Sequence, residues 1–228
     1  MAEKSDSHRR REILHAAARL FRHAGYERTS VRQIAEAVSM TSGSLFYHFN
    51  SKEEILVAVM EEGIRNAFNR VRAGLEREQR MPEKLLAMVR CHLGVLLGPH
   101  LDALMVLVYE WRSLSAPAMK RVLAWRNGYE DLWDGVLAAA AAQGFVHRDV
   151  VLVRQAALGA LNWTGQWYRR DSRLDVDALG LRMYELLFPR LHEHLGERAA
   201  FATAAAGPRS ADEVGAFSIL SLDGENLK

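Results

Sequence analysis

Apolar residues recur with the period of an α-helix along most of the chain, and no stretch alternates polar and apolar positions as a half-buried strand does. Residues 7–24 carry a single apolar stripe that consists of Ile13, Ala17, Leu20, Phe21 and Ala24. The same period, interrupted by glycines and prolines, predicts two short helices within residues 30–50 and a longer one from residue 52 into the seventies. Further helices are predicted near residues 82–97, 99–114, 117–143, 148–170 and 176–195. The sequence therefore predicts an all-α protein of about nine helices.

Two N-terminal capping boxes bound a compact unit at residues 29–54. Ser30 pairs with Gln33 at the start of the first short helix, and Ser51 pairs with Glu54 at the start of the long one. The apolar face of the first short helix consists of Val31, Ile34, Ala35 and Val38. These spacings predict where each helix begins and which side of it is buried.

A tight turn at Ser39 and Met40 separates the two short helices. Thr41 follows as the predicted N-cap of the second helix. We expect this second helix to bury Leu45, Phe46 and Phe49. Two short helices packed across a tight turn form a helix-turn-helix, whose second helix enters the major groove of DNA.

Small and polar side chains gather where this second helix would meet DNA. They leave room for the backbone to approach bases and phosphates, and Tyr47 and His48 can donate hydrogen bonds to phosphate oxygens. Lys52 adds a positive charge, and Arg32 and Thr29 lie close enough in sequence to reach the flanking backbone. The predicted DNA-binding residues are Thr29, Arg32, Thr41, Ser42, Gly43, Ser44, Tyr47, His48 and Lys52.

The N-terminal quarter of the chain resembles the DNA-binding domain of the TetR family of bacterial transcriptional regulators. The segments that carry this resemblance are Ala24-Gly25-Tyr26, Thr29-Ser30-Val31, Ile34-Ala35, Gly43-Ser44-Leu45, Tyr47-His48-Phe49 and Ser51-Lys52-Glu53-Glu54. The resemblance implies contacts with a double-stranded DNA operator at the positions named above. Two positions depart from the family pattern, because Ser39 replaces the usual turn glycine and Ser42 stands where relatives are often basic.

The distribution of charge agrees with a DNA-binding head. The formal net charge of the whole chain is only +2, but residues 8–52 contain eight Lys or Arg against three Glu. A basic head attached to a mildly acidic body is the arrangement that phosphate binding favours. The cluster His8-Arg9-Arg10-Arg11 either contacts DNA, along the phosphate backbone or in a minor groove, or forms an ordinary solvated helix start.

All five tryptophans lie between residues 111 and 167, outside the predicted head. Such aromatic residues line ligand pockets, but they equally fill cores and dimer interfaces. Asn162 and Gln166 lie four residues apart and share a helix face next to Trp163 and Trp167. The predicted ligand-binding residues are Tyr109, Trp111, Arg112, Trp125, Tyr129, Trp133, Asn162, Trp163, Gln166, Trp167 and Arg170.

This region more loosely resembles TetR-family members that sense acyl-CoA esters. The resemblance rests on Tyr109-Glu110-Trp111-Arg112, on residues 126–129, on residues 158–164 and on Trp167-Tyr168-Arg169. It implies a repressor that an acyl-CoA, or a similar intermediate of lipid or steroid catabolism, releases from a palindromic operator. The alternatives are a sensor of another hydrophobic compound, such as a drug or aromatic acid, and a helical protein that does not bind DNA.

The predicted organisation has three parts. Residues 1–50 form the DNA-binding domain, residues 51–196 form the ligand-binding and dimerisation domain, and residues 197–228 form a disordered tail. The resemblance implies a homodimer through the helices at residues 148–170 and 176–195. Apolar residues surround much of the first of these helices, which is typical of a helix buried on more than one side. Pro189 is expected to kink the second helix or to end its regular part at Phe188.

No sequence pattern indicates an enzyme. Nucleophile-elbow, dinucleotide-binding, phosphate-loop and zinc-protease motifs are all missing, so we expect no catalytic residues, no cofactor and no metal. Cys91 is the single cysteine and has no partner for an intrachain disulfide. The N-terminus lacks the apolar segment of a signal peptide, and no long uncharged apolar run is present. These features favour a cytoplasmic protein that does not enter a membrane.

Overall fold

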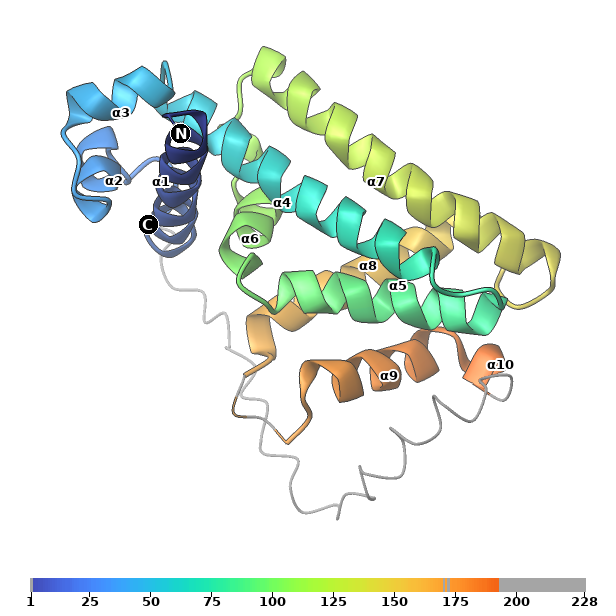
Figure 1. Ribbon diagram of the computed structural model, residues 1–228. Helices are drawn as coiled ribbons and strands as arrows, with labels where there is room; N and C mark the ends of the chain where they lie inside the picture. The colour runs from blue at the N-terminus through green and yellow to red at the C-terminus, as the bar shows by residue number, and fades with distance from the viewer. Residues whose placement is uncertain (1, 170, 172, 193–228) are drawn as a thin grey trace, which may run out of the picture.

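The structure is a computed structural model that describes residues 2–169, 171 and 173–192. Within these residues the chain forms ten α-helices, one short 3-10 helix and no strand, which confirms the predicted all-α class (Figure 1). The elements are α1 (Ala2–Ala24), α2 (Val31–Ala37), α3 (Ser42–His48), α4 (Lys52–Leu75), α5 (Met81–Leu96), α6 (Leu101–Tyr109), η1 (Trp111–Ser113), α7 (Ala116–Ala142), α8 (Val150–Trp167), α9 (Val176–Leu187) and α10 (Pro189–His192).

Helices α1, α2 and α3 form a small head at one end of the molecule (Figure 1). Its core is built from side chains that the sequence pattern placed inside, with Phe21, Ile34 and Leu45 all fully buried. The predicted capping box of Ser30 and Gln33 is complete, whereas that of Ser51 and Glu54 is present in part. Ser30 and Gln33 cap α2 reciprocally, and the Ser51 side chain accepts a hydrogen bond from the Glu54 backbone N–H at the start of α4.

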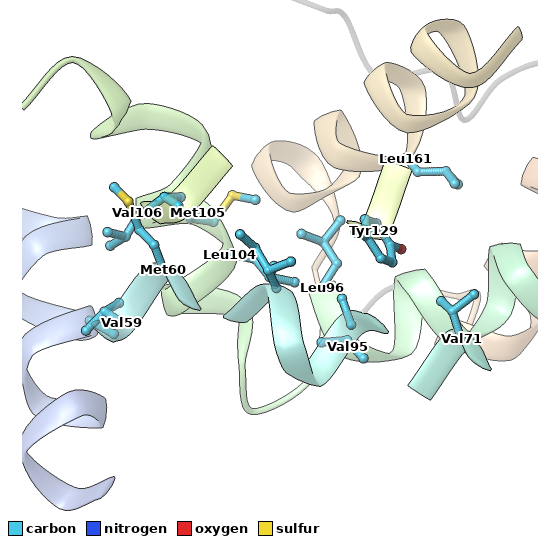
Figure 2. Packing of buried hydrophobic residues seen from close by; sticks show 14 of the residues in the cluster. Val59, Met60, Val71, Val95, Leu96, Leu104, Met105, Val106, Tyr129 and Leu161 are labelled. Carbon is cyan, nitrogen blue, oxygen red and sulfur yellow. The ribbon is translucent and has the colours of Figure 1, made fainter. Parts of the chain in front are cut away.

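Helix α4 runs from the head through the middle of the body (Figure 1). It packs against α5, α6 and α7, while α8 packs on α7 and α9 packs on α5. Figure 2 shows the interior of this bundle, where Leu96 of α5, Leu104 of α6 and Tyr129 of α7 come together. The long connector α4 is therefore shared by the head and by the core of the body.

Two helix boundaries differ from the sequence prediction, and a third agrees with it. Helix α1 begins at Ala2 rather than near residue 7, because residues 2–4 (Ala-Glu-Lys) are strong helix formers that need no apolar stripe. Helix α6 ends at Tyr109, and the chain continues as a single 3-10 turn before Ser115 caps α7. Pro189 ends the regular helix α9 just before Phe188, as predicted, and opens the separate short helix α10.

The prediction that Phe46 belongs to the core is wrong. Phe46 is 49% exposed, whereas its neighbours Leu45 and Phe49 are buried. Consecutive residues point about 100° apart around a helix, so a helix of only seven residues cannot turn both Leu45 and Phe46 inward. Phe46 lies instead on the surface of the head. The predicted tail at residues 197–228 lies outside the described residues.

No single helix in the described ranges is both long and apolar enough to cross a membrane. Helices α5 and α6 meet the length and composition criteria only as a pair, and the chain bends by 93° between them.

Candidate DNA-binding surface and ligand cavity

The turn before α3 is held in a strained conformation. Ser39 has a φ of 55°, in the left-handed region where residues other than glycine are uncommon. The backbone N–H of Met40 then donates to the Ala35 carbonyl at 2.8 Å, and Thr41 follows as the N-cap of α3. The Thr41 hydroxyl accepts a hydrogen bond from the Ser44 backbone N–H at 3.1 Å. This turn fixes the direction in which α3 leaves α2.

The outer side of α3 presents the residues expected to meet DNA. Gly43, Ser44 and Tyr47 are exposed, and the Tyr47 side chain is 84% exposed with no hydrogen bond to the described part of the protein. Phe46 lies beside it on the same surface. The side chain of Arg32 extends from α2 and pairs with Glu36 at 2.7 Å. Hydroxyl groups, an aromatic phenol and a guanidinium thus face solvent together.

Three of the predicted DNA-binding residues make internal contacts instead. Thr29 is 2% exposed, and its hydroxyl donates to the Gly25 carbonyl at 2.8 Å. The ammonium group of Lys52 donates to the Tyr26 carbonyl at 3.0 Å and lies 4.1 Å from the centre of the Tyr26 ring. The imidazole of His48 is largely covered and lies 3.1 Å from the Asp6 carboxylate. In this conformation these side chains hold the head together and attach it to α4.

The basic cluster at the start of α1 is also partly engaged within the protein. The guanidinium of Arg10 lies 4.2 Å from the centre of the Phe49 ring, and Arg9 pairs with Glu12 at 2.7 Å. These contacts attach the start of α1 to the head, and contact of the cluster with DNA stays a prediction.

The body contains a cavity of about 620 Å³ bounded by α4 to α8 and η1. This volume lies within the range of small-molecule sites in proteins. Its apolar lining comes from Ile64, Ala67, Leu104, Leu107, Val108 and Leu158. The cavity therefore offers apolar surface within the body, and the exposed residues Val108, Tyr109 and Arg112 in its lining show that it opens to solvent.

Charged groups line another part of the cavity wall. Arg154 is buried and binds both Glu130 and Asp134, the latter at 2.8 Å. Arg126 pairs with Glu130 at 2.6 Å and lies 5.7 Å from the Trp111 ring. These two arginines are thus balanced by two carboxylates. Arg112 is exposed at the same cavity, and no ion pair involves it in the described part of the chain.

Three polar residues of the cavity lining, His92, Tyr129 and Asn162, are joined by hydrogen bonds. The imidazole Nδ1 of His92 lies 2.7 Å from the Tyr129 hydroxyl, and its Nε2 lies 3.1 Å from Asn162 Oδ1. Burial lowers the pKa of His92 to about 4, an effect that the hydrogen bond to Asn162 partly opposes. Burial likewise raises the pKa of Tyr129 well above its ordinary value. At neutral pH both groups are therefore uncharged.

The structure brings five of the predicted ligand-binding residues together on this cavity. They are Tyr109, Trp111, Arg112, Tyr129 and Asn162. Gln166 does not line the cavity, but its amide donates to the Tyr109 hydroxyl at 2.6 Å. Trp133 is fully buried behind the wall, where its ring packs against His92 and Tyr129.

Three of the other four predicted ligand-binding residues are not found in the cavity lining. Trp125, Trp163 and Trp167 are 40%, 61% and 44% exposed and do not line the cavity, and Arg170 lies outside the described residues. Sequence reasoning missed His92 and Arg154. Both lie within apolar helical stretches, where one polar residue gives no sign of what it contacts.

Both parts of the chain match models of known protein families. Residues 13–59, which include the helix-turn-helix, match the model of bacterial regulatory proteins of the tetR family. Residues 78–191, half of the chain, match the model of the tetracyclin repressor-like C-terminal domain. The chain belongs to the TetR family. This TetR-family protein is a DNA-binding transcriptional regulator and not an enzyme.

Individual relatives resemble the chain over both the head and the body. It is 26% identical over 184 residues to the fatty acid metabolism regulator protein of Bacillus subtilis, an alignment that covers 79% of this chain and 94% of that protein. AibR in complex with isovaleryl coenzyme A and operator DNA is 28% identical with a TM-score of 0.72, covering 79% of this chain and 98% of that chain. The superantigen PfiT is 44% identical with a TM-score of 0.67, covering 79% and 96% respectively.

Proposed function

We propose that this TetR-family regulator is a homodimeric repressor that binds a near-palindromic operator in the cytoplasm and is released from it by an acyl-CoA. The observation that carries the proposal is the 620 Å³ cavity, whose lining combines apolar side chains with three arginines, Arg112, Arg126 and Arg154. An acyl-CoA requires an apolar space for its acyl chain and cations for its phosphates.

The distribution of groups around the cavity supports this class of ligand. Leu104, Leu107 and Leu158 provide apolar surface for an acyl chain. Arg112 is exposed and has no carboxylate partner in the described ranges, so it is free to bind a phosphate. Trp111 lies next to it and offers an aromatic face. AibR, one of the similar proteins, has been crystallised with isovaleryl coenzyme A, and another is named for fatty acid metabolism.

Helix α6 supplies a direct path from the cavity to the head. Its C-terminal half carries Leu104, Leu107, Val108 and Tyr109, which line the cavity. Its first turn carries Asp102, which pairs with Arg22 of α1 at 2.7 Å. A ligand that fills the cavity displaces α6, and the movement reaches the head through this pair and through α4. Release requires that the ligand bind the DNA-free arrangement more tightly than the DNA-bound one.

The proposed homodimer uses α8 and α9. Large apolar side chains on these two helices face solvent in the single chain, with Leu152 at 58%, Trp163 at 61% and Leu186 at 75% exposure. Large exposed apolar side chains on helices that the family resemblance assigns to the interface support this arrangement. Leu152→Glu is expected to convert the dimer into monomers in sedimentation experiments, whereas Trp125→Glu on α7 leaves it intact. A dimeric Leu152→Glu variant would place the interface elsewhere.

The ligand proposal is tested by titrating acyl-CoAs of different lengths into a complex of the protein with DNA from its own promoter region. Fluorescence anisotropy of the DNA should fall with an acyl-CoA and stay constant with free CoA. If every acyl-CoA leaves the complex intact, the effector is another hydrophobic compound, and the acyl-CoA proposal is wrong.

A cavity-filling variant shows whether release uses this cavity. Gly159 lines it, and a Cβ built at this position meets no atom within 4 Å. Gly159→Leu is therefore expected to lose the response to acyl-CoA. Because Gly159 is exposed on the side of α8 that carries Leu152 and Trp163, sedimentation must first show that the variant is still a dimer that binds DNA. Gly135→Leu is the matched control, since Gly135 on α7 also has open space around it but does not line the cavity. A normal response in Gly159→Leu would contradict binding at this site.

A further inference from the structure

The hydrogen bonds that link Tyr129, His92 and Asn162 run in one direction, from the Tyr129 hydroxyl as donor to the Asn162 carbonyl oxygen as acceptor. The Oδ1 atom of Asn162 can only accept, so the Nε2 atom of His92, 3.1 Å away, must carry a hydrogen and donate it. A neutral imidazole has one N–H, which leaves Nδ1 as an acceptor. The Tyr129 hydroxyl, 2.7 Å from Nδ1, therefore donates to His92. Burial lowers the pKa of His92 to about 4, which agrees with a neutral ring.

This direction leaves one strong donor without a protein partner. The Oδ1 atom of Asn162 is occupied by His92, and its Nδ2 group makes no hydrogen bond to the described part of the chain. Asn162 lines the cavity, as do His92 and Tyr129. Asn162 is half-buried, so its Nδ2 group is available to a molecule that enters the cavity. A ligand that supplies an acceptor there gains a hydrogen bond, which a ligand without an acceptor cannot make.

We propose that Asn162 determines ligand specificity by donating a hydrogen bond from Nδ2 to a carbonyl oxygen of the bound molecule. A carbonyl group fits because it accepts without bringing a donor that would need its own partner. His92 and Tyr129 act as positioning residues, because their hydrogen bonds hold the Oδ1 atom of Asn162 toward His92 and leave its Nδ2 group for the ligand. The proposal rests on the ligand cavity of the proposed function and specifies which chemistry it selects.

Two sources of this carbonyl fit an acyl-CoA. One is the thioester carbonyl, and the other is an oxo group further along the acyl chain. Hexanoyl-CoA, its thioether analogue S-hexyl-CoA and 3-oxohexanoyl-CoA distinguish them in binding titrations. Weaker binding of the thioether than of hexanoyl-CoA assigns the thioester carbonyl. Similar binding of these two, with tighter binding of the oxo compound, assigns the chain carbonyl.

A pair of neutral compounds tests the proposal independently of CoA. Acetophenone and α-methylstyrene have nearly the same shape, but the first has a carbonyl oxygen where the second has a CH2 group. Calorimetric titration of the wild-type protein should show about threefold to tenfold tighter binding of acetophenone, the effect of one neutral hydrogen bond. Asn162→Leu should bind both compounds equally.

Gln155→Leu is the matched control, because Gln155 is a second amide that lines the same cavity. It should retain the preference for acetophenone, and both variants should bind promoter DNA as the wild type does, which shows that they are folded. Equal binding of the two compounds by the wild type, no binding of either, or an unchanged preference in Asn162→Leu would overturn the proposal. If the ketone preference depends on Asn162 while no acyl-CoA releases DNA, this inference stands and the acyl-CoA function is wrong.

Discussion

Arg22 of α1 and Asp102 of α6 form an ion pair of 2.7 Å between residues 80 positions apart in the sequence. Their side chains are 28% and 23% exposed, so water screens the pair only in part. The pair joins the DNA-binding head to the helix whose other end lines the ligand cavity. It is therefore well placed to transmit a change at the cavity to the head.

Asp102→Asn should reduce this transmission. The substitution removes the charge that balances Arg22, and we expect it to lower the free energy of unfolding by about 1 kcal/mol. The ratio of DNA affinities measured without and with ligand should fall toward one. Anisotropy titrations and urea denaturation measure the two effects.

The exposed pair of Arg72 and Glu76 provides the control. Its atoms are 3.8 Å apart and its side chains are 59% and 70% exposed. Glu76→Gln should change neither the affinity ratio nor, by more than about 0.5 kcal/mol, the stability. If Asp102→Asn has the same ratio of DNA affinities without and with ligand as the wild type, the Arg22–Asp102 pair does not transmit the effect of the ligand to the head.

Tyr47→Ala should weaken operator binding without unfolding the head. The Tyr47 side chain is 84% exposed, so its loss should change stability by less than about 0.5 kcal/mol. If the phenol contacts a phosphate or base, affinity for DNA should fall about tenfold. Trp125→Ala removes an exposed aromatic residue of the body and should leave DNA affinity unchanged. Equal DNA affinities of Tyr47→Ala and wild type would exclude Tyr47 from the interface.

The turn at Ser39 carries strain that substitutions should reveal. Because its φ is 55°, glycine at this position relieves a steric cost that outweighs the added freedom of the unfolded chain. Ser39→Gly should raise the free energy of unfolding by about 0.5 kcal/mol, whereas Ser39→Val should lower it by about 1–2 kcal/mol. Urea denaturation measures both. Equal stability of the glycine and valine variants would contradict the assigned backbone conformation.

Acid should destabilise the protein partly through His92. Its pKa is lowered to about 4 in the folded chain, while an unfolded histidine titrates near 6.5. Between these values the unfolded chain binds a proton that the folded chain does not, so stability is lost as pH falls from about 6.5 to about 4. His92→Gln should show a shallower loss of thermal stability over this window. Parallel curves for the two proteins would mean that His92 is not buried as a neutral ring.

The local features of the head were predictable because short-range physics sets them. The capping boxes at Ser30 and Ser51 and the tight turn at Ser39 and Met40 follow from residues within a few positions of each other. The internal contacts of Lys52 and His48 were not predictable in this way. They depend on Tyr26 and Asp6, which only the packing of α1 brings close.

The cavity was predicted only in part for a similar reason. Tyr109, Trp111 and Asn162 stood out as aromatic or amide residues in apolar helices, and they do line it. His92 contacts Tyr129 and Asn162 across three different helices, and no periodicity in one helix encodes that meeting. The aromatic residues that proved to be exposed, such as Trp163, share the composition of cavity residues but lie on the outer side of α8.

An acyl-CoA that favours the DNA-free arrangement of the protein must bind the free protein more tightly than the protein–operator complex. Calorimetric titration of one acyl-CoA into the free protein and into the protein–operator complex tests it most directly. We expect tighter binding to the free protein, by the same factor by which that acyl-CoA weakens operator binding. Equal affinity for the free and the DNA-bound protein would contradict it.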